Sequence, residues 1–307
     1  MMQRRVFLKT CSALAAALVL RPGGVLAYTG KPHSRRIPKS GERLPAIGMG
    51  SWLTFAVGDD AAARAQRVAV VRAFFAAGGR LIDSSPMYGT AEEVIGYCLE
   101  QLHARSRVFS ASKVWTVGWQ AGVRQMRRSQ HLWGIQGFDL MQVHNLLDWR
   151  TQLATLKEWK QQGLIRYIGV TTSHGRRHRE LAGLMEKEDA IDFVQFTYNL
   201  IDREAEQRLL PLAAERQLAV IINRPFRGGE LFEYVARRAL PGWARQIDCD
   251  NWAQLFLKYI ISHPAVTCAI PATSRVDHMH ENMGSLYGRL PDSELRKKIQ
   301  SYFRSML

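Results

Sequence analysis

Short apolar segments rich in branched residues recur along this chain, and longer amphipathic segments separate them. This alternation is typical of repeated strand–helix units, in which parallel strands form a sheet covered by helices. In residues 61–78, for example, Val68, Val71 and Phe75 fall on one helical face, and Gly78 ends the segment. The predicted strands are 45–50, 80–83, 107–113, 139–144, 166–171, 192–197, 218–223 and 266–271.

The number of predicted strands decides between one domain and two. A chain of 307 residues is long enough for two average domains or one large α/β domain. No Pro/Ser-rich linker or long internal repeat divides it. Eight strands alternating with helices therefore predict a single α/β domain, a (β/α)₈ TIM barrel, rather than two doubly wound sheets.

The first 27 residues have the features of a signal peptide. Arg4 and Arg5 precede an apolar run over 11–20, and small residues at 25–27 form a cleavage site. The run is too short to span a bilayer comfortably, so we expect no stable membrane anchor. Residues 3–9, QRRVFLK, resemble the twin-arginine signal, which implies folded export through the twin-arginine translocase. We expect a periplasmic mature domain over 28–307.

Cysteines and basic clusters give no sign of a metal or nucleic-acid site. Cys98, Cys249 and Cys268 remain after processing, without CxxC or tight spacing, so we expect no metal and treat burial as their default. The net charge is +15, but the basic clusters are not interleaved with stacking aromatics, so no nucleic-acid partner is predicted. The cluster at 173–179 follows the fifth strand and is suited to attract a phosphate or an acidic substrate.

Ionisable side chains stand at or just after the ends of three successive predicted strands. Asp83 ends the second strand, and Tyr88 lies in the loop after it. Lys113 ends the third strand and His144 ends the fourth. A lone Asp there is usually a cap, and a lone His is usually a structural group. Because strand ends form the active-site face of a barrel, the four together favour a catalytic site.

These residue types suit proton transfer to a carbonyl oxygen. A phenol with a pKa near ~10 is a poor acid at neutral pH, but a neighbouring ammonium stabilises the phenolate and lowers that pKa. Lys113 can act on Tyr88 in this way, and Asp83 can pair with Lys113. His144 can donate a hydrogen bond that orients the carbonyl.

The motifs around these residues resemble those of the aldo-keto reductases. They are LIDSSPMYG at 81–89, SASKVW at 110–115 and MQVHN at 141–145. Residues 37–52 resemble the family's N-terminal hairpin and first strand, and residues 270–284 its nucleotide-binding segment. The resemblance implies an N-terminal hairpin, NADPH as cofactor with NADH as the alternative, hydride transfer to an aldehyde or ketone, and a tyrosine proton donor.

The prediction of a nicotinamide cofactor depends on the resemblance, because no GxGxxG motif follows a strand to mark a Rossmann dinucleotide site. The chain departs from the family at Thr171-Thr172, where Ser-Asn is usual, and at Asn223-Arg224-Pro225, where an aromatic ring is usual. Arg224 is instead a candidate to bind an anionic substrate or to alter the redox preference. The complete set of candidate cofactor residues is Gly50, Ser51, Trp52, Thr171, Thr172, Gln195, Asn223, Arg224, Pro225, Thr273, Ser274, Arg275, His278, Glu281 and Asn282.

Aromatic residues after the first, third and fourth strands are candidates for the substrate pocket. They are Trp52, Phe55, Trp115 and Trp149, and each is also a candidate for helix packing. A small hydrophobic or aromatic carbonyl is the expected substrate, and we expect a monomer or weak oligomer. The alternative function is a nucleotide-binding sensor or regulatory subunit with little turnover, since the departures lie where the cofactor would bind.

Overall fold

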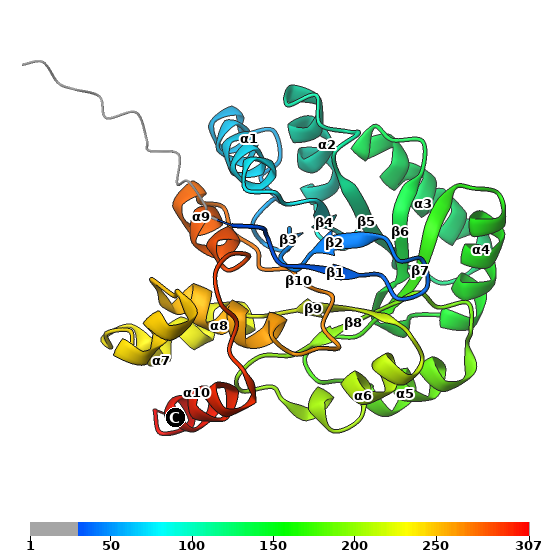
Figure 1. Cartoon of the computed structure of the whole chain (residues 1–307). Helices are drawn as coiled ribbons and strands as arrows, with labels where there is room; N and C mark the ends of the chain where they lie inside the picture. Colours follow the sequence, from blue (N-terminus) through cyan, green and yellow to red (C-terminus); the bar gives the residue numbers. More distant parts are fainter. Residues whose placement is uncertain (1–29, 307) are drawn as a thin grey trace, which may run out of the picture.

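The computed structural model describes residues 30–306, so the predicted signal peptide lies outside the described residues. Within this range eight parallel strands form one sheet in sequential order, each hydrogen-bonded to the next (Figure 1). The strands are β3 (Met49–Gly50), β4 (Leu81–Asp83), β5 (Phe109–Val114), β6 (Phe138–Val143), β7 (Ile165–Thr171), β8 (Phe193–Thr197), β9 (Ala219–Asn223) and β10 (Cys268–Ala269).

Contacts between the first and last strands bring the sheet edges together. The Gly48 N–H donates to the Ala269 carbonyl at 2.8 Å, and the Gly50 N–H donates to the Pro271 carbonyl at 3.0 Å. A parallel bridge also joins Gly50 to Ala272. The (β/α)₈ barrel is therefore confirmed, although β3 and β10 are shorter than predicted.

Helices surround the barrel and connect successive strands (Figure 1). The helix predicted over 61–78 is α1, which ends two residues earlier and begins at the Asp60 cap. The helices are α1 (Ala61–Ala76), α2 (Ala91–Gln101), α3 (Trp119–Trp133), α4 (Trp149–Gln161), α5 (His178–Lys187), α6 (Leu209–Glu215), α7 (Glu230–Val235), α8 (Trp252–Ile261), α9 (Val276–Gly284) and α10 (Ser293–Arg304).

An antiparallel hairpin of β1 (Ser34–Arg36) and β2 (Arg43–Pro45) lies across one end of the barrel (Figure 1). Gly41, in the turn, has a φ of 76°, which glycine adopts at little cost. Ile37 and Leu44 from the hairpin are fully buried against apolar barrel residues. Burying each side chain contributes about 1.5–3 kcal/mol, which stabilises the packing of the hairpin against the barrel. The hairpin thereby closes the amino end of the barrel.

Inside the barrel the side chains change from apolar to polar along the strands. Period-two alternation places Leu81 and Asp83 on the same side of β4, and Ala111 and Lys113 on the same side of β5. Apolar residues at the amino ends form a compact inner core with the hairpin. The polar residues at the carboxyl ends of the strands therefore form a buried layer that packs against this apolar inner core.

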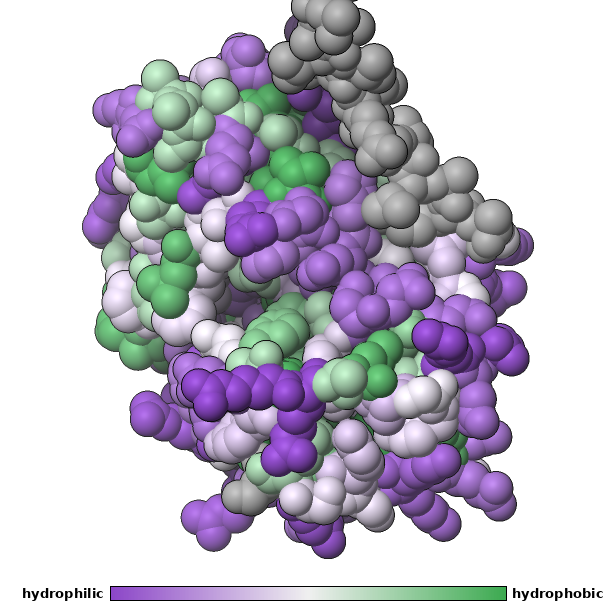
Figure 2. Space-filling model, turned by 90° about the vertical axis from the view of Figure 1, so that its left-hand side faces the viewer, coloured by the Kyte–Doolittle hydropathy of each residue, from purple (hydrophilic) through white to green (hydrophobic). Residues whose placement is uncertain are grey.

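Hydrophilic and hydrophobic side chains are mixed on the side of the molecule that carries α9 and α7 (Figure 2). In residues 30–306 no helix is both long and apolar enough to span a bilayer. The three cysteines of this range are buried free thiols, as expected. The same range contains no group of His, Cys, Asp and Glu side chains arranged to hold a metal ion.

Candidate active site

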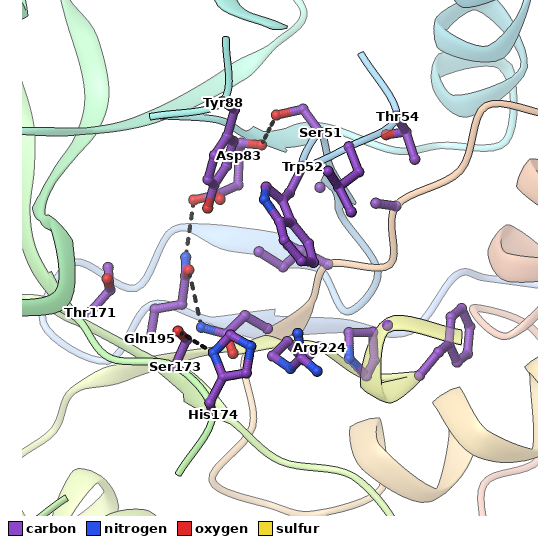
Figure 3. Close-up of a pocket in the computed structure, with 18 of the residues that line it drawn as sticks. Ser51, Trp52, Thr54, Asp83, Tyr88, Thr171, Ser173, His174, Gln195 and Arg224 are labelled. Carbon is purple, nitrogen blue, oxygen red and sulfur yellow. Dashed lines mark hydrogen bonds between the residues drawn. The ribbon is translucent and has the colours of Figure 1, made fainter. Parts of the chain in front are cut away.

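A cavity of about 310 Å³ opens at the carboxyl ends of the strands, and loops after β3, β4, β6, β7 and β9 surround it (Figure 3). Many residues singled out in the sequence line this cavity. They are Gly50, Ser51, Trp52, Asp83, Tyr88, His144, Thr171, Gln195, Asn223, Arg224 and Pro225. Ser173 and His174, from the basic cluster at 173–179 singled out in the sequence, also line it. Sequence reasoning missed other residues of the wall, including Leu53, Met87, Asn145, Phe226 and Phe232.

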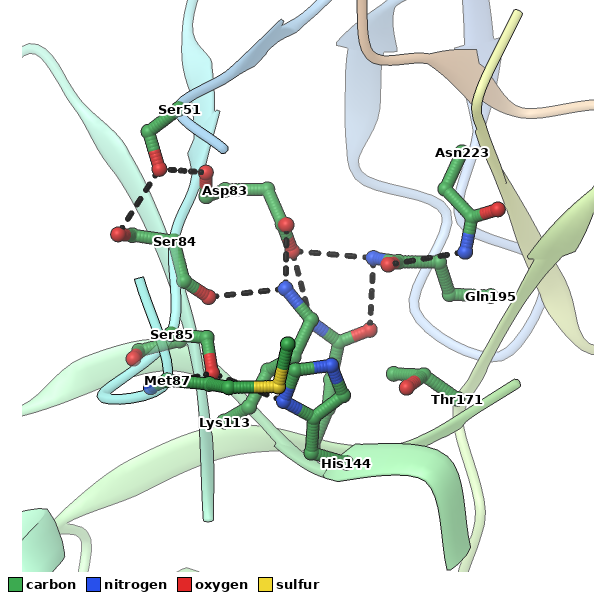
Figure 4. A network of polar contacts seen from close by, with 12 residues as sticks. Ser51, Asp83, Ser84, Ser85, Met87, Lys113, His144, Thr171, Gln195 and Asn223 are labelled. Atoms are coloured by element: carbon green, nitrogen blue, oxygen red, sulfur yellow. Dashed lines mark hydrogen bonds and ion pairs between the residues drawn. The ribbon is translucent and has the colours of Figure 1, made fainter. Parts of the chain in front are cut away.

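A buried ion pair lies below the cavity (Figure 4). The Lys113 ammonium donates to Asp83 Oδ2 and, at 2.8 Å, to the Ser84 carbonyl. The Lys113 side chain is fully buried and the Asp83 side chain is 3% exposed. Burial is the largest single effect and lowers the pKa of Lys113, but the charges of Asp83 and Tyr88 and the hydrogen bonds to them together outweigh burial, and the net pKa is raised. Lys113 therefore stays charged beside the cavity.

Two glutamines hold the other carboxylate oxygen of Asp83. Gln142 Nε2 and Gln195 Nε2 each donate to Asp83 Oδ1 at 3.0 Å. Gln142 was missed in the sequence, although it precedes His144 by two positions and therefore shares its side of the strand. All the side-chain partners of this carboxylate in the described residues are donors, so both of its oxygens accept hydrogen bonds.

Tyr88 lies half-buried in the loop after β4, next to this ion pair. The Lys113 ammonium nitrogen lies 5.1 Å from the centre of the Tyr88 ring. Burial raises the pKa of Tyr88, and the charge of Lys113 opposes this without reversing it. The lowered pKa predicted from the sequence is wrong, because desolvation of the phenol outweighs the effect of the neighbouring ammonium. In the described structure Tyr88 is thus a protonated phenol at neutral pH.

His144 lies beside Tyr88, and its ring is neutral. The two ring centres are 5.8 Å apart and the rings are nearly perpendicular. Burial, followed by the charge of Lys113, lowers the pKa of His144 to about 3. Its Nδ1 atom lies 2.8 Å from Ser85 Oγ, a contact that sequence reasoning missed. A neutral imidazole in this place can donate one hydrogen bond to a group in the cavity.

The candidate amide-binding residues are already connected to one another. Asn223 Nδ2 donates to the Thr172 carbonyl at 2.9 Å, and Thr171 Oγ1 accepts from the Asn145 N–H at 3.2 Å. Gln195 is engaged with Asp83, as described above. The Thr172 hydroxyl is buried without a hydrogen-bond partner in the described chain and does not line the cavity. A nicotinamide amide at this wall would have Thr171 and Asn223 as cavity-lining polar neighbours.

Arg224 and Trp52 face each other across the cavity (Figure 3). The Arg224 guanidinium carbon is 6.0 Å from the centre of a Trp52 ring. Within the described residues this guanidinium forms no ion pair or hydrogen bond, and burial lowers its pKa. His174 lies on the same wall, and burial and Arg224 both lower its pKa. An unpaired cation in a cavity favours an anionic group of a ligand.

The candidate cofactor residues between Thr273 and Asn282 lie just before α9 and along it, outside the cavity wall. Arg275 is exposed and pairs with Asp277, and the Thr273 hydroxyl accepts from the Arg275 N–H at 3.1 Å. The N-cap residue Arg275 makes no side-chain cap bond to α9, and the Asp277 carboxylate accepts from the His278 N–H in the first turn. Ser274 and Glu281 are partly exposed, His278 is exposed and Asn282 is buried.

The expected apolar walls are only partly present. Phe55 is a correction, because it is fully buried in the core between barrel and helices and does not reach the cavity. Trp149 is partly buried against the same core, with Arg150 over its ring. Trp115 is 41% exposed, and its ring centre is 6.5 Å from that of His144. Trp149 is the first residue of α4, and Phe55 lies in the loop after β3, so both side chains pack against the core between barrel and helices.

Exposed apolar side chains gather beside the cavity mouth. Within residues 30–306 the exposed large apolar side chains all follow β3, β4 or β5 on the active-site side of the barrel. We call this set the apolar rim; it comprises Trp52, Leu53, Met87, Trp115, Val117 and Trp119. Such gathering is typical of a ligand or partner surface, whereas scattered exposed residues would need no explanation.

Comparison with known proteins gives consistent matches. The sequence profile described as aldo/keto reductase family matches residues 46–301. Methylglyoxal reductase YeaE of Escherichia coli is 30% identical over 266 residues, covering 84% of this chain and 91% of that protein. The NADH-specific methylglyoxal reductase of E. coli is 25% identical, covering 71% and 81%. A crystal structure of an aldo-keto reductase from Klebsiella pneumoniae with NADPH superposes with a TM-score of 0.74 at 26% identity, covering 89% and 96%.

Proposed function

The chain belongs to the aldo/keto reductase family, and from this membership and the geometry of the cavity we propose that it reduces an aldehyde or ketone to an alcohol with NADPH. NADH is the alternative cofactor, since one relative is described as NADH-specific. The observation that carries the proposal is the cluster of Tyr88, His144 and the buried Asp83–Lys113 pair at one end of the cavity.

The cavity has features that fit a dinucleotide. The unpaired Arg224, which lines the cavity, suits a phosphate group. Thr171 and Asn223 supply polar atoms at the deep end, next to Gln195. When bound, the cofactor supplies the hydride that reduces the carbonyl carbon. The protein then has to position the carbonyl and deliver a proton.

Tyr88 delivers that proton. Its raised pKa keeps the phenol protonated at neutral pH, ready to donate to the developing alkoxide. Once the proton has left, the phenolate lies beside the Lys113 ammonium, whose charge is secured by Asp83. Lys113 therefore favours the state after transfer more than the state before it, which lowers the barrier. His144 donates a hydrogen bond to the carbonyl oxygen and orients it toward Tyr88.

The substrate is proposed to be a carbonyl compound with an apolar part. The apolar rim is continuous with the cavity, since Trp52, Leu53 and Met87 belong to both. An apolar group that extends from the carbonyl would cover this rim and remove it from water, gaining about 25 cal/mol for each Å² buried. The related E. coli proteins are described as reductases of methylglyoxal, a small carbonyl. Small and apolar carbonyls therefore belong in one assay panel.

The first experiment measures NADPH consumption by the chain from Tyr28 against that panel, and cofactor binding by tryptophan fluorescence. We expect Tyr88→Phe to lower turnover by about 10²–10⁴-fold with cofactor binding retained. Tyr97→Phe is the matched control, because it keeps the ring under Arg64 and lies outside the cavity. Tight cofactor binding without turnover in the unmodified chain would favour the nucleotide-binding sensor instead, with the departures at Thr172 and Asn223-Arg224 as the cause.

We also propose that the protein is exported folded to the periplasm through the twin-arginine translocase, carrying its cofactor. The support is the QRRVFLK sequence together with the requirement for a dinucleotide. In cell fractionation, replacement of both Arg4 and Arg5 by lysine should retain the protein in the cytoplasm. Protein purified from the periplasm should contain nucleotide, and an empty, inactive protein there would contradict cofactor loading before export.

A further inference from the structure

Ser85 contacts both residues that are proposed to act on the carbonyl, and Figure 4 shows its contact with His144. Its carbonyl oxygen accepts from the Tyr88 N–H at 2.9 Å, and its side-chain oxygen lies 2.8 Å from His144 Nδ1. The same side-chain oxygen accepts from the Met87 N–H at 3.2 Å. Ser85 is fully buried. One residue thus connects the loop after β4, which carries Tyr88, to the imidazole that follows β6, two strands away in the sheet.

The direction of the Ser85–His144 hydrogen bond follows from the donors and acceptors present. The Ser85 hydroxyl has one hydrogen to donate, and the Met87 N–H already occupies one of its lone pairs. Among the described residues, its other recorded partner is His144 Nδ1. The hydroxyl hydrogen has a partner among the described residues only when it points to Nδ1, and Nδ1 then carries a lone pair. In a neutral imidazole the single ring hydrogen is then on Nε2.

We propose that Ser85 is a positioning residue that holds His144 in the tautomer with hydrogen on Nε2, so that the ring presents a donor to the carbonyl oxygen. This inference rests on the proposed function. His144 lines the cavity, and its Nε2 atom has no hydrogen-bond partner among the described residues. The other tautomer would direct a lone pair at the carbonyl oxygen and repel it. His144 was predicted from the family resemblance, whereas Ser85, which sets its tautomer, was not.

A simpler account makes Ser85 only a turn residue, because a serine hydroxyl that accepts from the N–H two positions later is a common turn contact. The two accounts differ in what happens at the imidazole. A turn role predicts that loss of the hydroxyl changes stability and leaves the histidine tautomer unchanged. A positioning role predicts that the tautomer changes even where the fold persists.

The test is nitrogen-15 NMR of histidine-labelled protein without cofactor or substrate, in which long-range proton–nitrogen correlations identify the tautomer. His144→Gln assigns the signal. We expect the Nε2–H tautomer in the unmodified chain, a mixed or reversed population in Ser85→Ala, and recovery in Ser85→Thr. Ser285→Ala is the matched control, since Ser285 is equally buried and its hydroxyl lacks a partner in the described chain.

Kinetics provide the second measurement. Ser85→Ala should lower kcat by about tenfold or more, as expected when one buried hydrogen bond is lost, with cofactor affinity unchanged and the threonine variant recovering most of the rate. The proposal would be overturned if the unmodified chain had the Nδ1–H tautomer. It would also be overturned if Ser85→Ala had the same histidine tautomer and the same kcat as Ser285→Ala. The NMR measurement needs no turnover, so it tests the role of Ser85 even if the proposed reductase function is wrong. The tautomer in the unmodified chain can be read without any variant, so a variant that fails to fold does not prevent the test.

Discussion

Replacing Asp83 by asparagine tests the centre of the site most directly. The carboxylate accepts from Lys113, Gln142 and Gln195, all of which are donors. Asparagine has one acceptor and one donor group, so its amide hydrogens must face one of these donors. The substitution keeps the size of the side chain and removes the charge that compensates the fully buried Lys113.

The expected cost follows from that burial. Removing one partner of a buried ion pair typically destabilises a protein by about 3–5 kcal/mol. Without Asp83, burial pushes the folded-state pKa of Lys113 below the 10.5 of the unfolded chain. The unfolded state then binds more protons between these two values, so the stability of the variant rises as pH increases toward 10.5. In the unmodified chain the raised pKa gives stability that is lost above that pH.

Urea unfolding of both proteins at pH 7 and pH 9.5 measures this effect. The difference in unfolding free energy should be about 3–5 kcal/mol at pH 7 and smaller at pH 9.5. Adding Lys113→Met to Asp83→Asn should recover part of the loss. Glu180→Gln is the control, because it breaks an exposed pair with Arg177 and should cost less than about 1 kcal/mol. A loss below about 1 kcal/mol for Asp83→Asn, independent of pH, would refute the reasoning.

Other expected results concern packing and protonation. A Cβ on Gly169 would lie 2.7 Å from Gln142 Cγ, so Gly169→Ala should cost about 1–3 kcal/mol in urea unfolding and lower kcat; unchanged values would contradict this packing. His144 titrates near pH 3 when folded and near 6.5 when unfolded, so stability should fall by about 1.4 kcal/mol per pH unit as pH decreases between these values. Equal pH slopes for His144→Gln and the unmodified chain would refute this. Because the pKa of Tyr88 is raised, kcat for reduction should be level through neutral pH and decrease only above about pH 10; a decrease near pH 7–8 would contradict a protonated Tyr88.

The barrel and its catalytic face were predictable because they depend on local spacing. Alternation of strands and helices predicted the fold, and the positions of Asp83, Lys113 and His144 at strand ends predicted that they share one rim. The structure places these residues together at the cavity. The period of two also contained the signal for Gln142, since it lies two residues before His144.

Other features depended on contacts between distant segments. Local sequence cannot tell that Phe55 packs into the core while Trp115 stays at the cavity mouth, because this depends on how each loop leaves its strand. The pKa of Tyr88 likewise depends on desolvation by residues from several strands, which outweighs the single neighbour that the sequence suggested.

Sequence by itself determined which side chains the strands carry, in what order, and toward which end of the barrel. Only the tertiary structure decided which of them touch: Gln142 and Gln195 meet on Asp83, and Ser85 meets His144. The physical reason is that side-chain direction repeats along one strand with a fixed period, whereas hydrogen-bond partners depend on the register between strands and on barrel closure, to which the whole chain contributes.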